Sequence, residues 1–156
     1  MSEPPKKTVI GIDLGTKNSC IGIWIAENNS VEILNNDIGE TTTPSSIAYT
    51  GSSQDDMQIT VGERAQSSEN WIYDAKRMIG KAIQDEDLQI YMEKWPFIVV
   101  EGPRHNCEIS IPGLGNFKVE EVSSHVLAYL KKIAERKVGT PVKDAVITVP
   151  AYFNNS

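Results

Sequence analysis

The chain has 156 residues, of which 40% are hydrophobic and 23% are charged, so it can bury one core and is too apolar to be disordered. Its formal net charge of −6 argues against a protein that follows nucleic-acid phosphates, which would carry a basic surface. No stretch approaches the roughly 18 apolar residues that span a bilayer, and no leader segment is visible. The two cysteines, at positions 20 and 107, lie too far apart for a CxxC metal or redox motif. We therefore expect a cytoplasmic protein without nucleic-acid or membrane partners.

The N-terminal part of the chain predicts a hairpin followed by a third strand. Residues 8–14 alternate between isoleucines and other residues, which is the period of two that is typical of a half-buried strand. Residues 15–18 predict a glycine-led turn, and residues 19–25 alternate again. Residues 31–35 predict the third strand.

The middle of the chain predicts short strands and one helix. Strands are expected at residues 46–50, 97–100 and 107–111. Residues 51–58 are polar and predict a loop, whereas residues 62–81 carry apolar side chains at helical spacing and predict a helix that stops near Gly80. The three tryptophans, at positions 24, 71 and 95, are expected in the core.

The clearest helix is predicted over residues 119–138. Its apolar residues recur at a spacing of three and four, with acidic residues in its first turn and basic residues in its last turn, as the helix dipole favours. Gly139 predicts its end. Residues 145–149 then predict a buried strand that Pro150 terminates.

The segment Gly11 to Ser19, GIDLGTKNS, is the stretch that most suggests chemistry. A strand delivers Asp13 to a turn whose backbone N–H groups, at residues 16–18, form a nest suited to a phosphate. Asp13 is suited to hold Mg²⁺ through water, because magnesium gives up its water ligands reluctantly. The pattern is neither a Rossmann fingerprint nor a P-loop, and an ordinary glycine hairpin explains it equally well, so both interpretations stay open.

Further segments give this motif a context. In chain order they are TTPSSIAYT at residues 42–50, DAKRMIG at 74–80, KWPF and VV at 94–100, EEVSS at 120–124 and VITVPAYFN at 146–154. Together with GIDLGTKNS they resemble the seventy-kilodalton heat-shock chaperone family, in that family's order and over nearly the whole chain. Sugar kinases, which share a looser form of the first motif, lack the other segments.

The resemblance implies roles for individual residues. Gly15, Thr16, Lys17 and Asn18 match the first phosphate-binding loop, and Asp13 matches the aspartate near the metal. Lys76 matches the catalytic lysine that reaches the γ-phosphate, and Pro150 matches the proline that couples nucleotide state to the rest of the chaperone. Lys17 departs from the family pattern, which has a threonine there; its charge either adds to the phosphate site or turns into solvent.

The resemblance also implies an α/β fold, namely the first lobe of an actin-like, ribonuclease H-like ATPase. Residues 6–38 and 117–156 would form subdomain IA, which we expect to be incomplete. Residues 39–116 would form subdomain IB, and residues 1–5 a flexible N-terminus.

The function that the resemblance implies is that of a heat shock protein 70, a stress-response chaperone that binds and hydrolyses ATP to drive protein folding. ATP or ADP and Mg²⁺ would be its cofactors, and the full-length protein would bind unfolded client peptides, J-domain co-chaperones and nucleotide-exchange factors. Because that family's ATPase domain is more than twice as long, we expect an N-terminal fragment with little ATPase activity of its own. The alternative is a naturally short, non-catalytic binding module, so whether this chain alone is an enzyme stays open.

Overall fold

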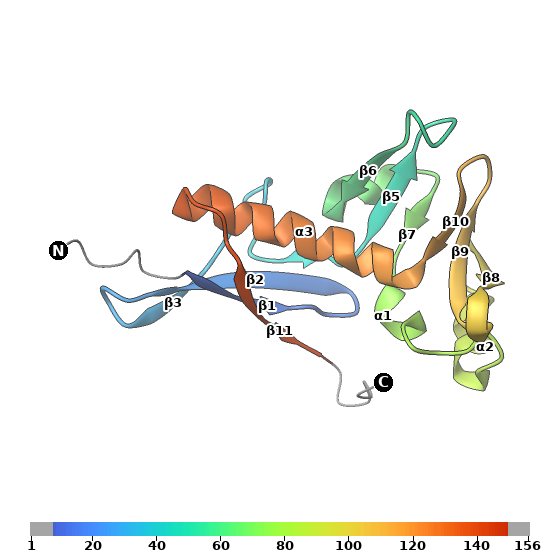
Figure 1. Cartoon of the computed structure of the whole chain (residues 1–156), viewed down its shortest axis with the longest axis horizontal. Coiled ribbons are helices and arrows are strands. Elements are labelled where there is room, and N and C mark those ends of the chain that lie inside the picture. Colours follow the sequence, from blue (N-terminus) through green and yellow to red (C-terminus); the bar gives the residue numbers. More distant parts are fainter. Residues whose placement is uncertain (1–7, 150–156) are drawn as a thin grey trace.

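The structure, a computed structural model, describes residues 8–149 as an α/β arrangement of mixed sheets around one long helix (Figure 1). The strands are β1 (Val9–Asp13), β2 (Asn18–Ile25), β3 (Ser30–Ile33), β4 (Thr43–Pro44), β5 (Ile47–Thr50), β6 (Gln58–Val61), β7 (Trp71–Ile72), β8 (Ile98–Glu101), β9 (Cys107–Ile111), β10 (Gly115–Lys118) and β11 (Asp144–Thr148). The α-helices are α1 (Ala75–Met78), α2 (Glu86–Met92) and α3 (Val119–Val138), and the 3₁₀ helices are η1 (Gly62–Ser67) and η2 (Pro103–His105). No helix in this described range is long and apolar enough to cross a membrane.

The first sheet has the strand order β11-β1-β2-β3, with β4 paired to the start of β2. The predicted hairpin is confirmed, because β1 and β2 are antiparallel and Ile10 lies opposite Ile23. The last strand, β11, returns from the far end of the sequence to pair in parallel with β1. This topology places the turn after β1 beside the C-terminal end of β11.

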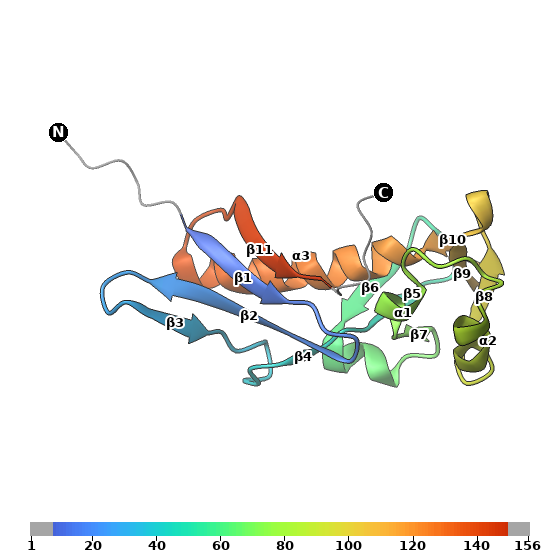
Figure 2. The same cartoon turned by 90° about the horizontal axis from the view of Figure 1, so that it is seen from below.

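Helix α3 packs on one face of this sheet and has the predicted bounds (Figures 1 and 2). The isoleucines that alternate along β1 and β2 face it and are buried, as are the apolar residues on the facing side of the helix. These buried residues are Ile10, Ile12, Ile21, Ile23, Val122, Val126, Leu130 and Ile133. Gly139 adopts a positive φ of 72° at the C-cap, a conformation that glycine permits without steric cost.

The other face of the sheet is not covered by any described residue. Trp24 is 53% exposed and Val146 is 68% exposed, so the expectation of a core Trp24 is wrong. The strand expected at 145–149 is present as β11, but it is exposed and not buried as expected. The reason is that β11 is an edge strand, which within residues 8–149 pairs only with β1, and α3 covers only one side. By contrast, Trp95 is 8% exposed, as expected.

Two three-stranded sheets lie near the N-terminal end of α3, one formed by β6-β5-β7 and one by β10-β9-β8 (Figure 1). They share a core in which the Tyr49 ring stacks on Phe117, with ring centroids 4.1 Å apart. His125 of α3 meets the edge of the same Tyr49 ring, and burial lowers the pKa of this histidine. The contact joins these sheets to the helix that also covers the first sheet.

The helix predicted over residues 62–81 is wrong for most of its length. This segment contains η1, the strand β7 and the four-residue helix α1 instead. Trp71 and Ile72 pair with β5, so their backbone groups find hydrogen-bond partners in a neighbouring strand and not within a helix. Asp74 then adopts a left-handed conformation with φ 59°, so the chain turns before α1 begins. Apolar spacing alone did not reveal this competition.

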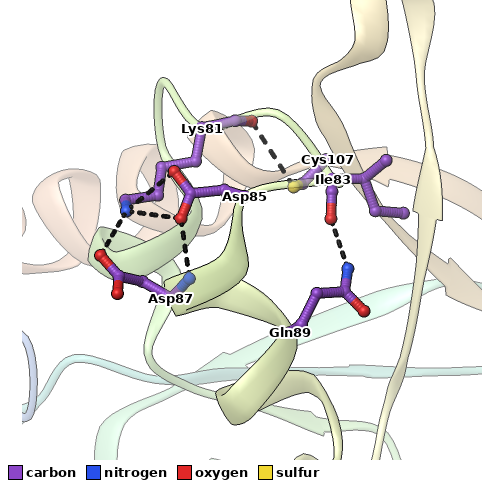
Figure 3. Close-up of polar contacts among 6 residues, drawn as sticks. All are labelled: Lys81, Ile83, Asp85, Asp87, Gln89 and Cys107. Carbon is purple, nitrogen blue, oxygen red and sulfur yellow. Dashed lines mark hydrogen bonds and ion pairs between the residues drawn. The ribbon is translucent and has the colours of Figure 1, made fainter.

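Helix α2 and the strands β4, β6 and β10 were not predicted. The start of α2 is nevertheless encoded locally, because the Asp85 side chain accepts a hydrogen bond from Asp87 N at 3.1 Å (Figure 3). Lys81 Nζ lies 3.1 Å from both Asp85 carboxylate oxygens, and this hydrogen bond lowers the pKa of Asp85. An aspartate followed by an acidic first turn was the signal in the sequence that could have located this helix.

The two cysteines differ in exposure, and we expect them to differ in reactivity. Cys107 is 2% exposed, its Sγ faces the Lys81 carbonyl oxygen at 3.6 Å, and burial raises the pKa of its thiol to about 11 (Figure 3). Because the thiolate is the reactive form, Ellman's reagent at pH 8 should modify the partly exposed Cys20 quickly and Cys107 only on unfolding. Cys20→Ser should remove the fast phase, and two thiols reacting at one rate in the native protein would contradict this assignment.

Candidate functional site

The end of β1 and the turn after it gather the polar groups of the candidate site. Asp13 is the last residue of β1 and is exposed. It lies between Cys20 of β2 and Thr148 of β11 in the strand register. The Thr148 hydroxyl donates a hydrogen bond of 2.5 Å to Asp13 Oδ1, which orients the Asp13 carboxyl group at the C-terminal ends of β1 and β11.

The turn between β1 and β2 is tight at its first residue. A Cβ atom on Gly15 would lie 2.0 Å from the carbonyl oxygen of Asn18, closer than real Cβ contacts come. Glycine at this position therefore lets the turn close against the carbonyl group of Asn18, which belongs to the same turn.

A neighbouring segment fixes this turn from one side. Ser45 N donates a hydrogen bond of 2.8 Å to the Lys17 carbonyl oxygen, and the buried hydroxyls of Ser19 and Ser45 lie 2.7 Å apart. Because a trans peptide unit points its C=O and N–H in opposite directions, the Asn18 N–H faces away from Ser45. That amide is therefore free of the β4 segment and oriented toward the other side of the turn.

Lys76 reaches the same turn from α1. Its Nζ donates a hydrogen bond of 2.5 Å to the Leu14 carbonyl oxygen, 62 positions earlier in the chain. The lysine is partly buried, which sets it apart from the exposed Lys17. The structure thus brings an ammonium group against the glycine turn.

The Lys17 side chain differs from that of Lys76, and which of its two orientations it takes beside a phosphate stays a prediction. It is exposed, and it forms no hydrogen bond or ion pair with another residue in the range 8–149. Arg77, next to Lys76, turns the other way and approaches Asp74, with Nε 3.6 Å from Oδ2. Lys76 is therefore the cation that the fold directs at the turn.

The enclosed space at the turn is small. A cavity of about 10 Å³ is lined by Leu14, Gly15, Thr16, Ser45 and Lys76, with residues of α1 and α3. That is room for about one water molecule, so a larger ligand would lie on the open side of the turn. No group of three or more His, Cys, Asp or Glu side chains among the described residues could hold a metal ion alone.

Some predicted positions lie outside this description, and some contributing residues were not predicted. Pro150 and the N-terminal residues 1–5 lie outside the described residues. Thr148 and Ser45 were missed as partners of the site, although both belong to segments that carried the family resemblance. Neither partner can be identified from spacing, because each depends on how distant strands align.

Comparison with known proteins gives a consistent result. The family model described as Hsp70 protein matches residues 9–156. A heat shock cognate HSP70 protein from Trypanosoma brucei brucei is 44% identical over 155 residues, which cover 94% of this chain and 22% of that protein. A putative heat shock 70 kDa protein 7 from Homo sapiens is 44% identical over 161 residues, covering 99% of this chain and 42% of that protein.

A third relative points the same way. A ribosome-associated molecular chaperone from Zygosaccharomyces rouxii is 42% identical over 161 residues, covering 100% of this chain and 25% of that protein. The chain thus spans less than half the length of each of these relatives. These matches confirm the resemblance drawn from the sequence motifs: the chain belongs to the Hsp70 protein family.

Proposed function

We propose that this chain supplies the first phosphate-binding part of the ATP site of an ATP-dependent chaperone. The observation that carries the proposal is the meeting of Lys76 with the glycine turn, where Nζ lies 2.5 Å from the Leu14 carbonyl oxygen. Turn amides and a lysine ammonium group together form a site that attracts phosphate oxygens. In this proposal the turn from Gly15 through Thr16 and Lys17 to Asn18 faces the phosphates, and Lys76 is the catalytic lysine at the γ-phosphate.

Asp13 would hold Mg²⁺ through water in this arrangement. A single carboxyl group is a poor ligand set for a bare metal ion, but Mg²⁺ keeps several water ligands and takes others from phosphate. The exposure of Asp13 and its fixed orientation beside Thr148 fit that role. The metal would supply neutralisation of phosphate charge, while the chain's own residues hold and orient the phosphates.

The rest of the proposal follows the family. Residues 6–38 and 117–156 would form subdomain IA of an actin-like first lobe, and residues 39–116 would form subdomain IB. Pro150 would couple the nucleotide to the remainder of the chaperone. Unfolded client peptides, J-domain co-chaperones and nucleotide-exchange factors would be partners of the full-length protein in the cytoplasm, and ATP hydrolysis would need the second lobe.

The open geometry predicts weak binding by this chain alone. Full enclosure of ATP, with its roughly thirty heavy atoms, would give about 9 kcal/mol at about 0.3 kcal/mol per atom. The cavity of about 10 Å³ at the turn encloses none of the nucleotide, so only the phosphate contacts on the open side are available. About 4 kcal/mol or less is then expected, which corresponds to a millimolar dissociation constant.

The direct test is a titration of the isotope-labelled chain with Mg·ADP and, separately, with Mg·ATP, followed by amide NMR shifts. We expect the amides of residues 15–18 to shift with a millimolar Kd for both nucleotides. Lys76→Met should weaken the response to Mg·ATP, whose γ-phosphate the lysine is proposed to reach, by about tenfold or more. A matched control is Lys132→Met, which removes an exposed lysine of α3 and should leave the titration unchanged.

Two results would overturn parts of this proposal. If saturating Mg·ADP shifts no amide in residues 15–18, the turn is not a phosphate site. If the chain binds with a micromolar Kd and turns ATP over, it holds a complete site, and the assignment of one half only is wrong.

A further inference from the structure

The backbone that carries Lys76 has an unusual conformation. Asp74, immediately before α1, has φ 59° and ψ 18°, in the left-handed region that side-chain-bearing residues seldom adopt. An aspartate at this position normally accepts a hydrogen bond from an amide of the helix it precedes. Asp74 makes no such cap, so its carboxyl group is committed elsewhere.

The Asp74 carboxyl group faces Trp95 and Arg77. The Trp95 indole Nε1–H donates a hydrogen bond of 3.3 Å to Asp74 Oδ2, and Arg77 Nε lies 3.6 Å from the same oxygen. The Asp74 side chain is 15% exposed and Trp95 is 8% exposed. The contact between Asp74 and Trp95 is therefore largely shielded from water. Hydrogen bonds and charge pairs that are shielded in this way are stronger than those at an open surface.

Tyr91 closes these contacts into a ring. The Arg77 guanidinium lies 4.4 Å from the centre of the Tyr91 ring, and Nη1 donates a hydrogen bond of 3.0 Å to the Tyr91 hydroxyl. The Tyr91 and Trp95 rings stack with centroids 6.2 Å apart. We call Asp74, Arg77, Tyr91 and Trp95 the α1 clamp, because they join α1 to α2 and to the segment before β8.

The α1 clamp helps to fix which way α1 is turned, together with the buried side chains of Ala75 and Met78. A helix of four residues has too few internal hydrogen bonds to hold its own orientation. Arg77 and Lys76 are adjacent in sequence, and adjacent residues on a helix point to different sides. With Arg77 held by Tyr91 and Asp74, Lys76 is directed to a different side of α1, where its Nζ meets the Leu14 carbonyl oxygen.

We propose that Asp74 and Trp95 are positioning residues for Lys76. The indole N–H of Trp95 holds the left-handed backbone conformation of Asp74, and this conformation directs the Lys76 side chain to the turn that begins at Gly15. This inference rests on the proposed function, because the position of Lys76 has a role only where the turn binds a phosphate. The position of the Lys76 side chain is itself a property of the chain without nucleotide.

The test compares tryptophan variants by lysine acetylation. Trp95→Phe keeps an aromatic ring for stacking and removes the N–H that Asp74 accepts. Trp71→Phe is the matched control, since the Trp71 Nε1 is buried and has no hydrogen-bond partner in the structure. Brief acetylation with an activated acetate ester, read by mass spectrometry well below the melting temperature, reports how freely each lysine moves.

We expect Trp95→Phe to raise the acetylation rate of Lys76 several-fold relative to Lys132 in the same molecule, and to weaken Mg·ATP binding. Trp71→Phe should do neither. Asp74→Ala should raise the ratio of Lys76 to Lys132 acetylation as Trp95→Phe does. Asp74→Asn keeps an oxygen acceptor and tolerates a positive φ, so its ratio should stay close to that of the unchanged chain.

The outcomes separate this inference from the proposed function. If Trp95→Phe and Asp74→Ala leave the ratio of Lys76 to Lys132 acetylation unchanged, or raise both rates equally, the positioning role is wrong. If the ratio rises as expected but no variant, including the unchanged chain, responds to Mg·ADP, the positioning role stands and the proposed phosphate site fails.

Discussion

Replacement of Gly15 by alanine is expected to lower the free energy of unfolding by about 3 kcal/mol and to remove the response of residues 15–18 to Mg·ADP. The added Cβ would lie 2.0 Å from the Asn18 carbonyl oxygen. That oxygen belongs to the backbone, so it can be relieved only by opening the turn. Urea unfolding gives the stability change, and the amide titration gives the change in binding.

Gly11→Ala is the matched control for this substitution. Gly11 lies in β1, four residues before Gly15, and a Cβ atom there would meet no heavy atom within 4 Å. Alanine also costs less backbone entropy than glycine in a strand, so this variant should be neutral or stabilised by up to about 1 kcal/mol. Equal destabilisation by both variants would show that the Gly15 turn is not closed as described.

Leu130→Ala should cause a similarly large loss of stability, because it empties part of the layer between α3 and the first sheet. Leu130 is 1% exposed and lies in the middle of the buried stripe of the helix. Removing its isobutyl group leaves a cavity that the packed sheet can only partly fill, for an expected cost of about 3 kcal/mol. A chain of about 150 residues should then melt roughly 6–12 °C lower, as calorimetry can measure.

Leu127→Ala makes the same chemical change on the same helix, at a position that is only partly buried. Its expected cost in the free energy of unfolding is at most about half that of Leu130→Ala, because folding buries less of the apolar surface of Leu127 than of Leu130. If the two variants lost equal stability, the loss would reflect the unfolded state rather than the buried layer.

How much of the fold the sequence predicts depends on whether the decisive contacts are local. The bounds of α3 follow from its own residues, since its apolar stripe, charged ends and Gly139 agree with one another. The helix expected over residues 62–81 fails because Trp71 and Ile72 find partners in β5, which no local pattern reports. The exposure of Val146 likewise depends on strand order and not on its apolar neighbours.

The candidate site divides in the same way. Asp13 and the turn that begins at Gly15 are adjacent in sequence, so strand and turn patterns alone suggest a place where a phosphate could bind. The proximity of Lys76 depends on a contact between residues 62 positions apart, and only the family resemblance suggested it. The α1 clamp was not foreseen, because Asp74 and Trp95 are 21 positions apart and neither forms a recognisable motif by itself.

The pairing of β1 with β11 has a consequence for how the chain folds during synthesis. Strands β1, β2 and β3 are neighbours in sequence and can pair as soon as they leave the ribosome, whereas Thr148 is separated from Asp13 by 135 positions. At about 5–20 residues per second, β11 is made roughly 7–27 s after β1. During that interval one edge of β1 has no strand beside it, and an open edge can pair with another chain. Among the described strands of the first sheet, β11 is thus the last to be made and the one that covers the open edge of β1. Slower translation lengthens the time in which the nascent chain is prone to aggregate.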